Sequence, residues 1–173
     1  MDDRSVVALQ IGREPRSVVD VVARCRLGLP VVIKVPPHLD DGTPFPTTYW
    51  LTCPLARRRI GRIEAAGGVK AVELKISADP EFAADFASAM ARYEAQRDAL
   101  VDPERSEHLP SGGVGGSRRG VKCLHAHYAD YAAGNRNPVG ADTAEEIEPL
   151  DCSLPCTTEA EGVVVLNPDW IEP

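Results

Sequence analysis

Residues Gly112–Gly134 read GGVGGSRRGVKCLHAHYADYAAG, a glycine-rich basic loop that leads directly into a helical pattern. Apolar residues recur at helical spacing from Val121 to Ala133, and Gly134 is a typical helix stop. The stretch places a cysteine, two histidines and three basic residues around the start of this helix. We therefore expect the fold to be organised around it, with a site at its beginning.

Elsewhere, short β-branched runs alternate with helical segments. Cys53-Pro54 and Asp79-Pro80-Glu81 mark helix starts, because proline lacks the N–H group that the first turn leaves unpaired. Strands are predicted at residues 17–23, 30–35, 47–52, 69–76 and 161–167, and helices at 4–11, from 53 to the glycine pair 67–68, at 79–100 and at 121–133. The pattern indicates an α+β fold, with a small mixed sheet of about four strands and three or four helices.

The 173 residues suffice for one domain with its own core. We assign residues 1–140 to a single α+β domain and residues 141–173 to an acidic, partly irregular tail. The tail holds nine acidic residues and no Lys or Arg, which suits a basic protein partner. Residues 1–140 are close to neutral overall, and this charge pattern is unlike that of a nucleic-acid-binding protein.

No apolar run approaches the roughly 20 residues that span a bilayer. The N-terminal sequence MDDRSVV lacks the regions of a signal peptide, so we expect no membrane segment and a cytoplasmic protein. In that compartment the five cysteines are expected to be reduced thiols or metal ligands. The arginines at 57–59 are expected to form a solvated helix face.

Three motifs, RCRLGLP, DGTPFPTTYWLTCP and GVKCLHAHYADYAAGNRNPVG, are long and unusual. With them the chain resembles a bacterial family of uncharacterised proteins, domain of unknown function 501, roughly from Gln10 to Gly140. The resemblance implies no activity, so hypotheses about the site depend on the residues themselves.

A zinc-like metal site is the first of these hypotheses. Cys123 and His127 are four residues apart and project from one face of a regular helix. Zinc accepts thiolate and imidazole ligands, although the C-x-x-C spacing of many zinc sites is missing. Isolated cysteines are also often buried small hydrophobes. The predicted ligand set is Cys25, Cys53, Cys123, His125 and His127.

An anion-binding loop is the second hypothesis. Backbone N–H groups at a helix N-terminus favour phosphate or carboxylate, and neighbouring basic side chains add charge-assisted contacts. A flexible glycine linker is the alternative interpretation. No nucleotide-cofactor motif is present. The predicted residues are Gly113, Gly115, Gly116, Arg118, Arg119 and Lys122.

A reactive cysteine is the third hypothesis, with Cys53 or Cys123 activated by a helix N-terminus or by basic neighbours. Cys152 and Cys156 form a C-x-x-x-C pair that suits an added metal ligand or a redox pair. The sequence thus favours an uncharacterised protein with a Cys/His metal site beside an anion-binding loop. The alternatives are a hydrolase or transferase of phosphorylated or anionic small molecules, and a non-enzymatic interaction protein that uses its acidic tail.

Overall fold

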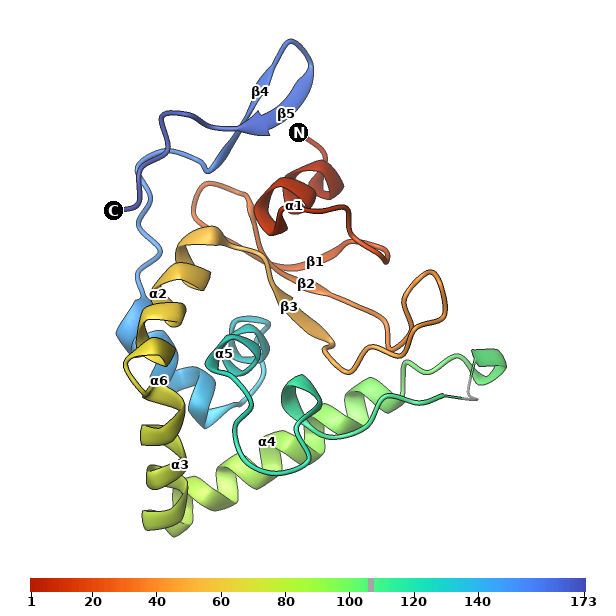
Figure 1. The fold of residues 1–173 in the computed structure, drawn as a ribbon, viewed down its shortest axis with the longest axis vertical. Coiled ribbons are helices and arrows are strands. Elements are labelled where there is room, and N and C mark those ends of the chain that lie inside the picture. Colours follow the sequence, from red (N-terminus) through yellow and green to blue (C-terminus); the bar gives the residue numbers. More distant parts are fainter. Residues whose placement is uncertain (106–107) are drawn as a thin grey trace.

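The computed structural model describes residues 1–105 and 108–173, and its centre is a three-stranded antiparallel sheet (Figure 1). The strands follow chain order, with β2 in the middle. A turn at Cys25–Leu29 joins the first two strands, with the Cys25 N–H group donating to the Leu29 carbonyl at 2.9 Å. The bounds are β1 Asp20–Arg24, β2 Pro30–Lys34 and β3 Tyr49–Leu51.

Helices cover this sheet and extend well beyond it. Helix α5 packs beside the sheet, where it contacts β3, α2 and α6. Helix α4 runs on the far side of α5 from the sheet (Figure 1). Two 3₁₀ turns, Pro103–Arg105 and Val114–Gly116, interrupt the connection between α4 and α5. The helices are α1 Asp3–Ile11, α2 Pro54–Ala65, α3 Gly68–Ala78, α4 Pro80–Asp98, α5 Leu124–Ala132 and α6 Pro138–Ile147.

Local signals set several helix ends as predicted. The Asp2 carboxylate accepts from the Ser5 N–H group at 2.9 Å, and Gly12 ends α1 in a left-handed conformation with φ of 75°. Pro54 occupies the first turn of α2. Asp79 accepts from two N–H groups of α4, at 3.0 and 3.1 Å. These caps satisfy donors that a helix cannot satisfy internally.

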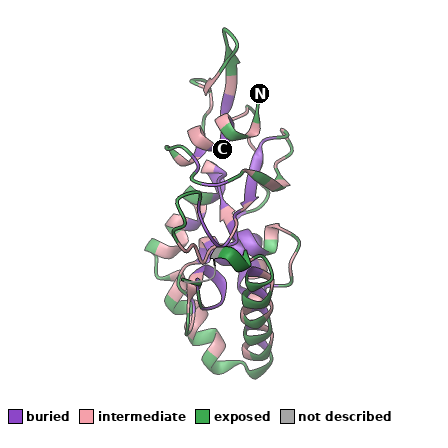
Figure 2. Ribbon diagram, turned by 90° about the vertical axis from the view of Figure 1, so that its right-hand side faces the viewer, coloured by how far each residue is buried: buried purple, intermediate pink, exposed green. Residues whose placement is uncertain are grey.

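The buried residues lie between the sheet and the helices, whereas the outer faces of the long helices are exposed (Figure 2). Leu55, Ile60, Tyr93 and Tyr128 are almost fully buried in the main cluster. Burial of such large side chains contributes about 1.5–3 kcal/mol each for the aliphatic ones. The core therefore joins α2, α4 and α5, which come from three separate parts of the sequence.

The predicted strand at residues 69–76 is wrong, because this segment forms helix α3. Val69, Val72 and Ile76 recur at the i, i+3, i+7 spacing of a helix, and all three pack partly against the core. Leu74, which the strand prediction placed on the apolar side, is 62% exposed. As a helix, the segment between α2 and α4 makes its backbone hydrogen bonds internally and needs no neighbouring strand.

The α+β class is confirmed, and the strands divide into two antiparallel sheets. The second sheet is the hairpin of β4 Thr157–Ala160 and β5 Val163–Leu166, which lies against α1 near the N-terminus (Figure 1). Helix α6 continues across residue 140, and a segment at residues 148–156 leads from it to the hairpin. Among the described residues, none of the helices has the length and apolar character needed to cross a membrane.

Arg57 and Arg58 are exposed and Arg59 is half-buried, so the predicted solvated face is confirmed for the first two, and arginines of α2 also contact other segments. Arg59 donates to the carbonyls of Ile147 and Pro149, at 2.6 and 2.7 Å. The Arg58 guanidinium stacks on the ring of Trp170, 5.0 Å from its centroid. Acidic residues after position 140 therefore lie on the chain's own basic side chains, in the ion pairs Asp142–Lys75, Asp151–Arg59 and Glu172–Arg62.

Candidate anion-binding site

A cavity of about 460 Å³ lies between β3, α2 and the start of α5. This volume is within the usual range for small-molecule sites, about 300–1,000 Å³. One wall is β3 with the loop before it, and the opposite wall is the segment that enters α5. Among the described residues that line the cavity there is no Asp or Glu. The basic lining residues are Arg13, Arg57, Lys122 and His125.

Short contacts position the three longer basic side chains. Arg13 stacks over the ring of Trp50, with its guanidinium carbon 5.8 Å from the centroid. Arg57 donates to the Gln10 carbonyl at 2.9 Å, and Lys122 donates to the Gly115 carbonyl at 3.0 Å. These partners are neutral, so each side chain keeps its positive charge uncompensated at the cavity.

His125 is held between two acceptors. Its Nδ1 lies 3.1 Å from Glu64 Oε1, and its Nε2 lies 3.1 Å from the Arg57 carbonyl oxygen. A carboxylate and a carbonyl both accept, so only the imidazolium form donates to both at once. The same Glu64 oxygen accepts from the Leu124 N–H group at 2.6 Å. Glu64 therefore fixes the ring and also caps helix α5.

Two aromatic residues of β3 form the apolar wall. Trp50 lies against Phe45, with ring centroids 5.2 Å apart, and the Arg13 guanidinium lies over the Trp50 ring. Tyr49 meets Tyr93 edge to face at 5.9 Å. The Tyr93 hydroxyl accepts from the Thr48 N–H group at 2.6 Å, and burial raises the pKa of Tyr93 to about 12. This hydroxyl stays protonated and holds the end of β3 in place.

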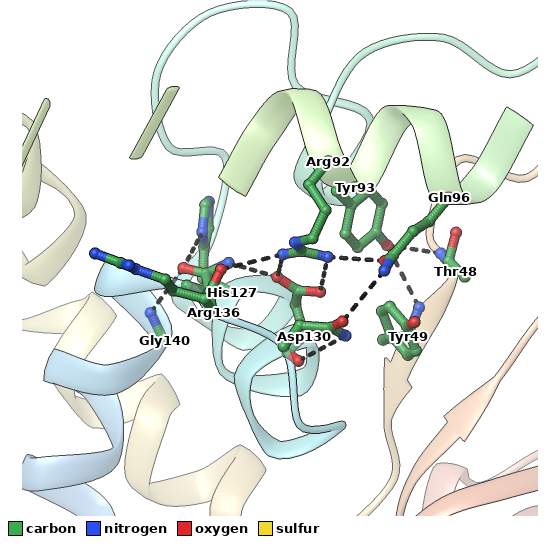
Figure 3. Close-up of polar contacts among 11 residues, drawn as sticks. Thr48, Tyr49, Arg92, Tyr93, Gln96, His127, Asp130, Arg136 and Gly140 are labelled. Carbon is green, nitrogen blue, oxygen red and sulfur yellow. Dashed lines mark hydrogen bonds and ion pairs between the residues drawn. The ribbon is translucent and has the colours of Figure 1, made fainter. Parts of the chain in front are cut away.

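A buried polar network joins α5 to α4 and to the start of α6 (Figure 3). Asp130, fully buried, forms an ion pair with Arg92 and accepts from Asn137 Nδ2 at 2.8 Å. Asn137 Oδ1 accepts from the Gly140 N–H group at 3.0 Å and faces His127 Nδ1 at 3.1 Å. His127 Nδ1 must donate, because this oxygen can only accept.

His127 is fully buried, with its ring stacked on Phe86 at 5.7 Å. Burial lowers its pKa from 6.5 to about 4, against a smaller opposite effect of the Asn137 hydrogen bond. Among the described residues, its Nε2 has no hydrogen-bond partner. The neutral ring therefore serves as a packed and hydrogen-bonded element of the core.

The structure distributes the predicted metal ligands over three places. Cys123 and His125 lie at the basic cavity, and His127 belongs to the buried network. Cys25 and Cys53 line a different, small cavity. Over residues 1–105 and 108–173, no three Cys, His, Asp or Glu side chains are positioned to hold a metal ion. A zinc site built from this set therefore stays a prediction.

The predicted anion-binding residues divide between two hollows. Gly115 and Lys122 line the basic cavity. Gly113, Arg118 and Arg119 line a second, more open hollow of about 580 Å³ between the glycine loop and α4. Gly116 packs against Pro46, where an added Cβ would come within 2.8 Å of the proline ring. Anion binding by all six predicted residues together also stays a prediction.

The glycine loop is packed, unlike a flexible linker. Arg97 is 1% exposed, donates to the Gly112 carbonyl and pairs with Asp98 at 2.7 Å. Gly113 lies against Met90, where a Cβ would come within 2.7 Å of the thioether methyl group. The absence of side chains thus allows the loop to lie close to α4.

Sequence reasoning missed the contributions of Arg13, Arg57 and Trp50 to the basic cavity. Each belongs to an element that shares no local pattern with the segment around Lys122. The pairing of β3 with α5 brings them together, and strand order could not be derived from the sequence. Neither an isolated arginine nor a tryptophan in a strand indicates an anion-binding cavity in the sequence.

The fold and the site together define the class of protein: this is an α+β protein with a basic cavity beside its central helix. One family model, described as "Protein of unknown function (DUF501)", matches residues 21–145, which is most of the chain. The chain belongs to this family, as the sequence motifs predicted. Comparison with curated proteins and with solved structures gave no match.

Proposed function

We propose that this protein binds a small phosphorylated molecule in the cavity between β3, α2 and α5. The observation that carries the proposal is the gathering of Arg13, Arg57, Lys122 and His125 around a cavity of about 460 Å³, with no Asp or Glu among its described lining residues. The three cationic side chains Arg13, Arg57 and Lys122 repel one another, and an anion of high charge density relieves that repulsion.

The aromatic wall narrows the chemical class of the ligand. Trp50 presents ring surface beside the basic groups, and such surface favours a planar apolar group. Arginine binds phosphate oxygens as a fork, and lysine binds them as a point charge. A phosphate ester that carries an aromatic or heterocyclic ring therefore matches the cavity at both ends.

Calorimetric titration with inorganic phosphate and with phenyl phosphate tests the proposal. Both should bind, with phenyl phosphate tighter, because the aromatic wall contributes only to the second. Arg13→Gln and Lys122→Gln should each weaken binding about 10-fold or more, the loss expected for a charge-assisted hydrogen bond. Trp50→Ala should remove most of the preference for phenyl phosphate.

Arg118→Gln and Arg119→Gln are the matched controls, because these side chains line the second hollow. They should leave the affinity unchanged. Weaker binding in the controls, with full binding in the Lys122 variant, would assign the anion to the glycine loop instead. No binding of either probe by the unaltered protein at millimolar concentration would refute the proposal.

Catalysis on such a ligand, as a hydrolase or transferase, remains a further prediction. Cys123 lies in the cavity wall, and burial raises its pKa. Its thiol is therefore mainly protonated at neutral pH. Both nitrogens of the neighbouring His125 already face acceptors. These observations favour ligand binding over nucleophilic chemistry as the conclusion to test first.

A further inference from the structure

Four of the five cysteines line one small cavity of about 20 Å³, which shares no described lining residue with the basic cavity. Its other described lining residues are uncharged, and most are apolar. A cavity needs about 10–15 Å³ to hold one water molecule, so this one accommodates a single water or ion but no organic ligand. The four residues are Cys25, Cys53, Cys152 and Cys156.

Three separate segments bring these cysteines together. Cys25 begins the turn between β1 and β2, and Cys53 is the residue before α2. Cys152 and Cys156 lie on the segment at residues 148–156, which passes beside α2 toward the hairpin (Figure 1). The fold thus positions two thiols rigidly, and the C-terminal segment adds two more.

Arginines fix the C-terminal segment beside the cavity. Arg59 holds its beginning through the carbonyls of Ile147 and Pro149. Arg26, in the turn that carries Cys25, donates to the carbonyls of Asp151 and Cys152. The Arg26 guanidinium therefore places a positive charge at the backbone of Cys152.

N–H donors already point at two of the sulfur atoms. Trp170 Nε1 donates to Cys152 Sγ at 3.4 Å, and Gln10 Nε2 donates to Cys156 Sγ at 3.6 Å. Such donors support thiolates that bind a metal, in the same way that outer-shell hydrogen bonds orient metal ligands generally. Burial raises the pKa of Cys53 to about 11, so this thiol is protonated in the ion-free protein.

We propose that Cys25, Cys53, Cys152 and Cys156 together bind one zinc ion. This set keeps two of the ligands predicted from the sequence and replaces Cys123 and both histidines by the C-terminal pair. Zinc–sulfur bonds of about 2.3 Å in a tetrahedron place the sulfur atoms about 3.8 Å apart. Among the described residues the sulfurs are not so positioned in the ion-free arrangement, so zinc binding requires the cysteine side chains to move toward one another.

Zinc binding exchanges protons for metal at all four thiols. Each S–H bond breaks, a Zn–S bond forms in its place, and the four protons go to solvent. The resulting site carries two negative charges, which Arg26 and the two N–H donors compensate. The affinity should therefore fall as the pH falls, because protons compete with zinc for the sulfurs.

Thiol labelling of the unaltered protein tests the ligand set without relying on variants. The reduced protein is treated with an alkylating reagent in the presence and absence of added zinc, and the labelled sites are identified by mass spectrometry. Zinc should protect Cys25, Cys152 and Cys156, which are partly exposed, and leave Cys123 labelled, whereas Cys53 is buried in the ion-free protein and does not report on protection. Protection of Cys123 together with loss of protection at Cys152 and Cys156 would overturn the proposed set.

Cobalt substitution gives an independent readout. Co²⁺ should give the visible and charge-transfer bands of a tetrahedral thiolate site, and zinc should displace it. The variant with Cys152→Ser and Cys156→Ser should bind at least about 100-fold more weakly, beyond the 10–100-fold losses typical of outer-shell changes. Cys123→Ser is the matched control and should retain full affinity.

Far-ultraviolet circular dichroism must show that both variants remain folded. Equal affinity in the double variant and the unaltered protein would refute the site. The absence of thiolate bands in unaltered protein treated with Co²⁺ under reducing conditions would refute it as well.

Discussion

Lowering the pH from 7 to 5 should destabilise the protein through His127. Burial lowers the pKa of this ring from 6.5 to about 4. The unfolded chain therefore takes up a proton near pH 6.5 that the folded chain does not accept until about pH 4. Because the folded pKa is the lower one, the stabilisation is present above the unfolded value and is lost as the pH falls from about 7 to 4.

The size of this effect follows from the two pKa values. The difference between 6.5 and about 4, at 1.36 kcal/mol per pH unit, is about 3 kcal/mol. The linkage relation assigns about 2 kcal/mol of it to the interval from pH 7 to pH 5. That loss is a large part of the stability of a typical domain, about 5–15 kcal/mol.

Urea unfolding at pH 7 and pH 5 measures the effect, with His127→Asn as the variant that cannot titrate. An asparagine amide can keep an N–H group near the position of Nδ1, so the contact with Asn137 can persist. The variant leaves a cavity and should be less stable at pH 7, but only the difference between the two pH values matters. The unaltered protein should lose about 2 kcal/mol more than the variant.

His108→Asn is the control, because residue 108 is exposed. It should reproduce the pH dependence of the unaltered protein. Parallel loss of stability in the His127 variant and the unaltered protein would show that the ring is not kept neutral by burial.

Three further substitutions test the packing and the caps by thermal and urea unfolding. Gly140→Ala should destabilise the protein by about 3 kcal/mol or more, because the new Cβ would lie 2.3 Å from the His127 carbonyl oxygen where α5 and α6 cross. Gly61→Ala, inside α2 with nothing within 4 Å of the new Cβ, should instead stabilise it by about 0.5–1 kcal/mol. Asp79→Ala should cost about 1 kcal/mol, because the N–H groups at the start of α4 lose their acceptor; an unchanged free energy of unfolding would show that this cap does not contribute.

Helix starts could be predicted from the sequence wherever the signal was local. Asp2, Cys53-Pro54 and Asp79-Pro80 all begin helices as expected, because caps and prolines act over one turn. The segment at 69–76 was mispredicted because its apolar residues fit two periods, and tertiary contacts decide between them. The antiparallel pairing of β3 with β2 has no local signature either.

The candidate site was predictable only in part, for the same physical reason. Lys122 was predicted as an anion-binding residue and His125 as a metal ligand, because both lie in the conspicuous stretch around Gly112–Gly134. Arg13 and Arg57 were missed because only the packed fold brings them to the cavity. The convergence of Cys25 and Cys53 with the C-terminal cysteines likewise depends on where the segment at 148–156 crosses the body.

The caps of the central helix come from far away in the chain. Glu64 accepts from the Leu124 N–H group and Glu73 accepts from the Val121 N–H group. Carboxylates of α2 and α3 therefore satisfy N–H groups at the start of α5 that no neighbouring side chain caps. Cys123, the residue before α5, forms no side-chain cap. The start of α5 can thus be completed only on a preformed α2–α3 surface, and in hydrogen exchange these amides should open together with those helices as one cooperative unit.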